Sequence, residues 1–198
     1  MSFAYRGQAA IVGLALFLCC TGRSGMRSEV VEGNASSKVR VVIYEDLQCG
    51  DCDKLRSLLD SKVLPRYGSR VAFVHRDFPL GKHDWARPAA AAARWVYAQD
   101  SQLGITFRRE ILAEHDHITA DRLKAWVQEF ASRNHLSEKD IVTAMTDPQM
   151  NALVDQDYQS GVARGVSHTP TVIAGGQVLV ETVLYEDLAK ALDIELGR

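Results

Sequence analysis

The sequence of 198 residues predicts an α/β fold in which a block of helices interrupts an α/β unit. Three observations predict it. A strand–helix–strand pattern occupies residues 39–74, every periodic apolar pattern from residue 83 to about 164 is helical, and strand patterns return at 170–180 before a last helix. We therefore expect one α/β domain, built from residues 39–82 and 166–198, with a helical insertion over residues 83–165.

The composition is that of an ordinary globular protein, with 46% hydrophobic and 24% charged residues. The 23 Lys and Arg residues against 25 Asp and Glu residues give a net charge of −2. This balance lacks the basic excess of nucleic-acid-binding domains, so we expect no nucleic-acid partner. Four cysteines are too few for a small domain held together by disulfides.

Residues 1–22 are predicted to be an export signal. The apolar run Ala9–Cys20 is shorter than the roughly 20 residues that span a bilayer. An uncleaved anchor and lipidation at Cys19 or Cys20 remain alternatives. The polar residues 23–38 would form a flexible tether in each case. We therefore expect a periplasmic or other extracytoplasmic location, with or without a membrane anchor.

The first strand–helix–strand unit is defined by its apolar spacing. Val39–Tyr44 is β-branched and apolar, as a buried strand is. Apolar residues at helical spacing over 51–63 predict a helix that stops before Pro65. Val71–Val74 is the next strand, and the handedness of crossover connections favours a parallel pair.

The helical block carries recognisable end signals. Ser137 and Asp140 resemble a capping box that opens a short helix. The Asp147–Pro148 step marks the start of a long helix, and Gly165 marks its end. The apolar patterns that predict the preceding helices lie at 84–99, 105–112 and 123–130.

The last β unit is a predicted hairpin. Residues 170–174 and 177–180 are short apolar runs joined by Gly175–Gly176, which suits a tight turn. Residues 184–196 form a final amphipathic helix. This element order is what places the cysteines and the Thr169–Pro170 step in neighbouring β units.

Removal of the signal would leave Cys49 and Cys52 as the only cysteines, where the first strand meets its helix. A helix N-terminus presents unpaired N–H groups and a partial positive charge, which stabilise a thiolate, the reactive form of cysteine. Cys49 is nearer the tip and should exchange with partners, while Cys52 should resolve the mixed disulfide. An oxidising compartment favours a disulfide between them.

Two structural readings of this pair stay open, an inert disulfide and half of a zinc site. Zinc would need two further ligands from six histidines, of which only His115 and His117 are close in sequence. One residue separates them, whereas zinc pairs are spaced by three to five. We therefore expect no metal and no bound cofactor, and we expect both histidines to be loop residues.

Three motifs, YEDLQCGDC at 44–52, HRDFPLGKH at 75–83 and GVSHTPTVIAGG at 165–176, together resemble the DsbA-like thiol–disulfide oxidoreductases of the thioredoxin superfamily. The resemblance implies a thioredoxin fold with an inserted helical domain and a cis Thr169–Pro170 bond that faces the cysteines. The backbone of Thr169 could then pair with an extended substrate segment as an added strand, which makes Thr169 and Pro170 candidate substrate-binding residues.

The sequence departs from the family around the cysteines. Many members place Pro and then an aromatic residue or His between them, whereas Gly50 and Asp51 stand here. An anionic Asp51 should destabilise the Cys49 thiolate by on the order of 1 kcal/mol, and so raise the pKa of Cys49. His168 occupies a position where the family often has a small residue. It would stabilise the Cys49 thiolate if its ring faced the sulfur, and otherwise it is a surface histidine without a role.

Glu45 and Asp46 follow the first strand and have two interpretations. They could relay protons to Cys52, or they could be ordinary solvated carboxylates, which is the expectation we adopt. Trp85, Trp95 and Trp126 are expected to be packing residues.

The sequence thus predicts an exported, monomeric dithiol oxidase that donates the Cys49–Cys52 disulfide to folding exported proteins with thiols. The resemblance implies a membrane quinone-linked partner of the DsbB or VKOR kind, which would reoxidise the pair. A reductase or isomerase with the same site is an alternative, although residues 23–38 are too short for the dimerisation domain of such isomerases. A thioredoxin-like binding module with a structural disulfide is the other alternative.

Overall fold

The computed structural model describes Met1 and residues 29–197 of the chain. The predicted export signal, its cleavage and the lipidation sites lie outside these residues. Within the described part, no helix has the length and apolarity that a bilayer crossing requires. The elements are β1 Val30–Gly33, β2 Arg40–Glu45, α1 Gly50–Leu58, η1 Leu59–Val63, α2 Leu64–Tyr67, β3 Ala72–Asp77, α3 Ala86–Gln99, α4 Ser101–Ala113, α5 Leu123–Arg133, α6 Glu138–Ala144, α7 Pro148–Ala163, β4 Thr171–Ala174, β5 Gln177–Val180 and α8 Tyr185–Glu195.

The five strands form one mixed sheet in the order β1-β3-β2-β4-β5. Strands β2 and β3 are parallel, as the sequence predicts, while β1, β4 and β5 pair antiparallel with their neighbours. The predicted hairpin is confirmed, because Gly175 and Gly176 both have positive φ and join β4 to β5. The sheet therefore brings the end of β2, which precedes the cysteines, beside the start of β4.

Strand β1 differs from the sequence-based expectation. Residues 23–38 were expected to be a flexible tether, but Val30–Gly33 pairs with β3 at the edge of the sheet. Val30 is fully buried and packs with Tyr97 and Ile105 of the helical insertion. Four residues give too short a pattern to predict a strand, and the partner strand is about 40 positions away in sequence.

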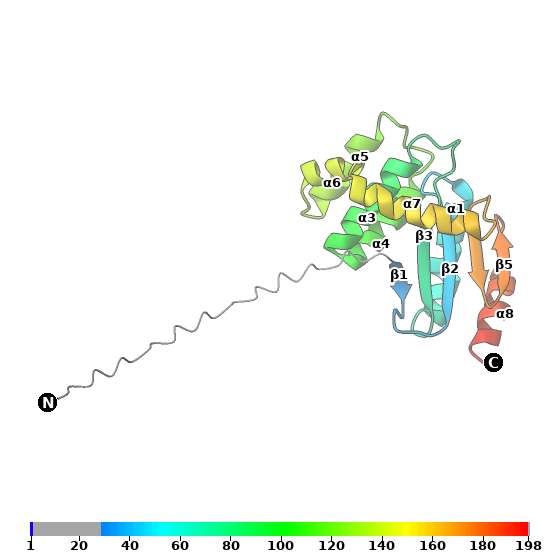
Figure 1. Cartoon of the computed structure of the whole chain (residues 1–198). Helices are drawn as coiled ribbons and strands as arrows, with labels where there is room; N and C mark the ends of the chain where they lie inside the picture. The colour runs from blue at the N-terminus through cyan, green and yellow to red at the C-terminus, as the bar shows by residue number, and fades with distance from the viewer. Residues whose placement is uncertain (2–28, 198) are drawn as a thin grey trace.

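The two faces of the sheet are covered by different helices (Figure 1). Val41 and Ile43 of β2 pack with Leu55 of α1 and Leu188 of α8 on one face. On the other face, Tyr44 contacts Phe78, whose ring stacks on Tyr158 of α7 with centroids 4.6 Å apart. Alternation of buried side chains along β2 therefore supports a layered α/β/α arrangement.

The helix after the cysteines does not stop before Pro65, contrary to the sequence-based prediction. Helix α1 continues through the π-helical turn η1 into α2, with Pro65 in the first turn of α2. A proline ring clashes with the carbonyl four residues earlier in a regular helix. The widened turn that precedes Pro65 lets the chain continue.

Helices α3 to α7 form the predicted insertion between β3 and β4 (Figure 1). The predicted end signals are confirmed: the Ser137 side chain accepts the Asp140 N–H, and Asp147 caps α7 ahead of Pro148. The apolar core of the insertion contains Trp85, Trp126 and Phe130, and both cysteines pack against it. The insertion therefore covers the cysteine end of the sheet.

Buried charges connect the insertion to the sheet. Arg108 of α4 donates to Glu45 of β2 at 2.8 Å and also to Asp77 of β3. Arg94 of α3 donates to Asp77 and to Asp157 of α7. All five side chains are at most 4% exposed, so each charge depends on its partners to remain ionised inside the protein.

Candidate active site

Cys49 is the N-cap residue of α1, and Cys52 lies in the first helical turn. Both are free thiols in this structure. Cys49 is partly exposed, whereas Cys52 is 1% exposed. The turn is fixed by the backbone, because the Cys49 N–H donates to the Asp46 carbonyl at 3.1 Å and the Cys52 N–H to the Cys49 carbonyl at 3.0 Å. One sulfur is therefore reachable by a partner and the other is enclosed.

The pKa of Cys49 is lowered from 9.0 to about 5. The largest cause is a hydrogen bond from the Cys52 thiol to the Cys49 sulfur; burial opposes it, and Thr169 and the backbone N–H groups of Cys52 and Asp51 add to the lowering. These backbone donors are the orphan N–H groups of the helix start. Cys49 is thus a thiolate at neutral pH.

Cys52 shows the opposite behaviour. Burial raises its pKa well above 9.0, and its hydrogen bond to Cys49 and the negative charges of Cys49 and Glu45 act in the same direction. The backbone N–H of Asp46 donates to its sulfur at 3.4 Å and only partly opposes this rise. In the reduced pair, one proton therefore stays on Cys52 while Cys49 carries the charge.

The Thr169–Pro170 bond is cis, as the resemblance implies. The Thr169 carbonyl lies 3.4 Å from the Cys49 sulfur and accepts from it when Cys49 is protonated, so the start of β4 reaches the exposed sulfur. Because a carbonyl only accepts, this bond favours the neutral thiol. The Thr169 hydroxyl is buried and has no hydrogen-bond partner among the described residues, and it is the group of Thr169 that can donate to the thiolate.

Two of the predicted tuning residues, Asp51 and His168, make contacts of their own beside the cysteines. Asp51 forms an ion pair with Lys54 at 2.8 Å, which offsets the charge expected to raise the pKa of Cys49. The backbone N–H of Asp51 helps to lower that pKa instead. The His168 ring bonds to the Ser167 hydroxyl at 2.9 Å, and no hydrogen bond joins it to Cys49 in the described structure.

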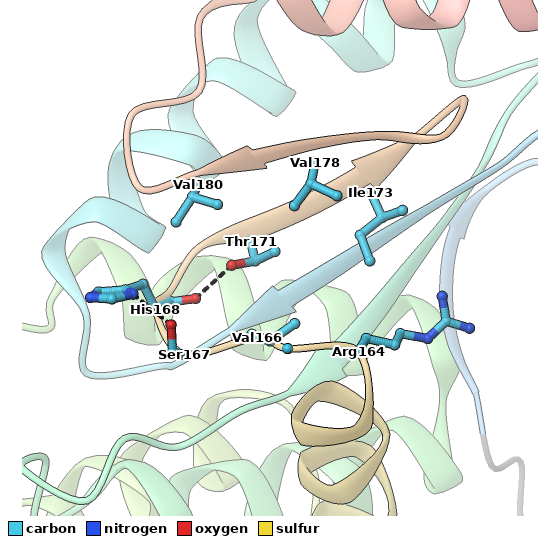
Figure 2. Close-up of a pocket in the computed structure, with 9 residues that line it drawn as sticks. Arg164, Val166, Ser167, His168, Thr171, Ile173, Val178 and Val180 are labelled. Atoms are coloured by element: carbon cyan, nitrogen blue, oxygen red, sulfur yellow. Dashed lines mark hydrogen bonds between the residues drawn. The ribbon is translucent and has the colours of Figure 1, made fainter.

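The loop before the cis bond borders a small cavity of about 60 Å³ between the end of α7 and the β4–β5 hairpin (Figure 2). Val178 and Val180 of β5 line it, although these two residues are 58% and 44% exposed. Figure 2 shows the His168 ring pointing away from these valines. The β5 edge of this cavity is therefore apolar, whereas Ser167, His168 and Thr171 line the end next to the cis-proline.

Glu45 and Asp46 are buried, so the expectation of solvated carboxylates is wrong for both. The Asp46 carboxylate accepts the N–H groups of Gln48 and Leu80 and the Nδ1 of His83, each at 2.7–2.8 Å. Burial nevertheless raises its pKa. For Glu45, burial is the largest influence, but His75 and Arg108 outweigh it and lower the pKa.

The sequence analysis missed one residue near the cysteines. A Cβ built on Gly50 would lie 3.0 Å from Nε2 of His115, which belongs to the loop after α4. Gly50 is separated from His115 by 65 positions, and no local pattern signals such a contact. The glycine itself was the available signal, because the absence of a side chain permits close approach of another group.

The described residues include no group of three or more His, Cys, Asp or Glu side chains that could hold a metal ion. The sulfurs, the helix N-terminus and the buried donors around them suffice for thiolate chemistry. Exchange of disulfides between proteins proceeds by thiolate attack on sulfur and requires no further group.

Comparisons with known proteins show what this chain is similar to. A sequence model described as thioredoxin matches residues 26–194. The fold is similar to that of oxidised BdbD from Bacillus subtilis, with a TM-score of 0.77 and 17% identity over 87% of this chain and 95% of that one. It is also similar to the thiol–disulfide exchange protein alpha-DsbA2 from Wolbachia pipientis, with a TM-score of 0.70 and 22% identity over 85% and 88% of the chains.

A third similar structure is a periplasmic thioredoxin-like protein from Salmonella enterica serovar Typhimurium, with a TM-score of 0.70 and 18% identity over 86% of this chain and 91% of that one. A comparison with curated proteins gives no match. The structural similarities, all below 25% identity, establish a thioredoxin-like sheet with a helical insertion.

Proposed function

This chain belongs to the thioredoxin family of thiol–disulfide oxidoreductases, and we propose that it works as a dithiol oxidase. Its C-x-x-C pair consists of Cys49 and Cys52. In this proposal, the Cys49–Cys52 disulfide is donated to folding exported proteins that carry thiols. Cys49 is the exchanging sulfur and Cys52 the enclosed one.

The observation that carries the proposal is the position of Cys49 at the start of α1, where the Cys52 thiol and the backbone N–H groups of Cys52 and Asp51 lower its pKa to about 5. A thiolate with this pKa stabilises the reduced pair at pH 7 by up to about 2.7 kcal/mol relative to a thiol of ordinary pKa. That is roughly a hundredfold in the equilibrium constant, or about 60 mV in the oxidising direction. Solvent screening at the partly exposed sulfur makes these figures upper bounds.

The asymmetry of the pair also supports the oxidase direction kinetically. A substrate thiolate attacks the accessible Cys49 sulfur, and Cys52 leaves and takes up a proton. A second substrate thiol then attacks the mixed disulfide, and Cys49 departs. Thiols of low pKa leave faster, so the release of oxidised substrate is favoured.

Thr169 and Pro170 are the proposed substrate-binding residues. The Thr169 carbonyl lies 3.4 Å from the Cys49 sulfur, and a substrate backbone that pairs beside it would bring a cysteine to the same place. The apolar side chains of Val178 and Val180 could contact residues that flank this cysteine. Gly50, Asp51 and His168 remain proposed tuning positions, with Gly50 admitting His115.

The proposed setting is periplasmic or otherwise extracytoplasmic, where oxidised cysteines persist. One structural neighbour is itself described as periplasmic. Reoxidation requires an electron acceptor, and we propose a membrane quinone-linked partner of the DsbB or VKOR kind. The proposal also includes a monomeric protein without a bound cofactor.

The test is oxidation of a reduced peptide with two cysteines by the purified disulfide form. We expect stoichiometric formation of the peptide disulfide, none with Cys49→Ser, and a trapped mixed disulfide with Cys52→Ser. Reduction of oxidised peptides in preference to oxidation of reduced ones would favour the reductase alternative. Absence of any exchange within minutes would favour a binding module with a structural disulfide.

A further inference from the structure

The helical insertion places His115 directly over the cysteine loop. A Cβ on Gly50 would lie 3.0 Å from Nε2, 3.7 Å from Cε1 and 3.9 Å from Cδ2 of this ring. The edge of the ring that carries Nε2 therefore faces the backbone between the two cysteines. Leu112 and Ile118, which flank the loop of His115, belong to the same apolar cluster as Cys52.

One hydrogen bond defines the tautomer of His115. Its Nδ1 lies 2.8 Å from the Leu112 carbonyl, and a carbonyl can only accept, so Nδ1 carries a proton. In the neutral imidazole, Nε2 then carries the lone pair. The nitrogen that faces the cysteine loop is therefore a proton acceptor, and it cannot stabilise a thiolate unless it is first protonated.

Nε2 is also available to a substrate. No hydrogen bond joins it to another described residue, and it is absent from the buried side-chain atoms without a partner, which are Arg56 Nε, Arg108 Nε and Thr169 Oγ1. An unpaired atom that is not buried is open to solvent. An acceptor that is not buried thus lies over Gly50, the residue that follows the exchanging Cys49 in the chain.

We propose that His115 is a catalytic base that accepts, through Nε2, the proton of the substrate thiol as that thiol attacks Cys49. This inference rests on the proposed function, because it concerns the first step of oxidation. The substrate S–H bond breaks and its proton passes to Nε2. The substrate sulfur bonds to Cys49 and the Cys49–Cys52 bond breaks, so the substrate is oxidised and Cys52 is reduced.

Protons and electrons balance over this step. The electron pair of the broken disulfide leaves on Cys52, whose raised pKa makes it take up one proton. His115 returns its proton to solvent, so one proton has moved from the substrate sulfur to Cys52. The titratable groups of the two facing segments are Cys49, Asp51 and Lys54 on the side of α1, and Glu114, Asp116 and His117 in the loop of His115. Asp51 pairs with Lys54, Asp116 with His117, and Glu114 accepts from Trp126.

The rate acceleration that His115 can supply has an upper limit. A cysteine of ordinary pKa is only about 3% thiolate at pH 7, so a base cannot accelerate its attack by more than about 30-fold. The advantage disappears at a pH where the substrate is already ionised. It is also absent for an aromatic thiol that is fully ionised at pH 7.

The experiment compares the disulfide forms of the wild-type protein and His115→Gln, which keeps a polar side chain without a basic nitrogen. Rates of reduction by a cysteine peptide and by an aromatic thiol are measured at about pH 7 and about pH 9.5. We expect the variant to react about tenfold more slowly with the peptide at pH 7, and equally at pH 9.5. We expect equal rates with the aromatic thiol and equal redox potentials.

His115→Phe fills the space over Gly50 with a ring that has no nitrogen. It should show the same rates as His115→Gln, and it replaces that variant in the experiment if His115→Gln does not fold. Equal peptide rates for the wild type and both variants at pH 7 would overturn the assignment. An equal loss with the aromatic thiol would also overturn it, because a purely structural role would slow both reactions. A wild-type protein that reacts with neither thiol would instead refute the proposed oxidase function.

Discussion

Replacement of Cys52 by Ala tests which group makes Cys49 acidic. The hydrogen bond from the Cys52 thiol is the largest single cause of the low Cys49 pKa of about 5. A hydrogen bond to a charged group contributes about 1.5–3 kcal/mol. At about 1.4 kcal/mol per unit, its loss should raise the Cys49 pKa by about one to two units.

The assay is the pH dependence of alkylation of Cys49 by iodoacetamide. The midpoint should move from about 5 in the reduced wild-type protein to about 6–7 in Cys52→Ala. Cys52→Ser is the matched control, because its hydroxyl retains a donor on the same atom position and should keep most of the lowering.

Two outcomes would refute this reasoning. A midpoint that stays at about 5 in Cys52→Ala would mean that the backbone N–H groups at the start of α1 lower the pKa without the thiol. An equal shift in the Ala and Ser variants would mean that side-chain volume, and not the donor, is responsible. The buried Cys52 of the wild-type protein should itself remain unreactive over this pH range.

Three further predictions concern the redox potential, a buried ion pair and a tightly packed glycine. As the pH rises, the redox potential should fall by about 60 mV per pH unit below pH 5 and by about 30 mV per unit above it, because reduction takes up only one proton once Cys49 is a thiolate. A plot of potential against pH without a change of slope near pH 5 would contradict this. Arg108→Met removes one ion-pair partner from each of two buried carboxylates, Glu45 and Asp77, and should cost about 3–5 kcal/mol in urea unfolding. A loss below about 1 kcal/mol would refute the pairing. Gly104→Ala puts a Cβ 2.5 Å from the Tyr97 backbone and should cost about 1–3 kcal/mol, whereas Gly81→Ala, in open space, should be neutral.

The parts of the fold that the sequence predicted are those with local signals. The buried strand before Cys49, the capped helices at Ser137 and Asp147, and the Gly175–Gly176 hairpin each depend on neighbouring residues. Periodicity, caps and turn glycines are properties of a few consecutive positions, so they can be recognised without the tertiary structure.

The parts that the sequence did not predict depend on residues far apart in the chain. Glu45 was expected to be solvated, yet it is buried because Arg108 approaches it across 63 positions. A buried charge is stable only when its partner is present, and no pattern around either residue specifies the pairing. His115 was assigned to a loop correctly, but its position over Gly50 follows from how the insertion packs on α1.

The central claim is that a stable Cys49 thiolate makes the Cys49–Cys52 disulfide an oxidant. Equilibration of the purified protein with glutathione buffers of known ratio measures this directly. We expect a redox potential at pH 7 well above the roughly −270 mV of thioredoxin. A value at or below that of thioredoxin would contradict the claim, whatever the rate of exchange.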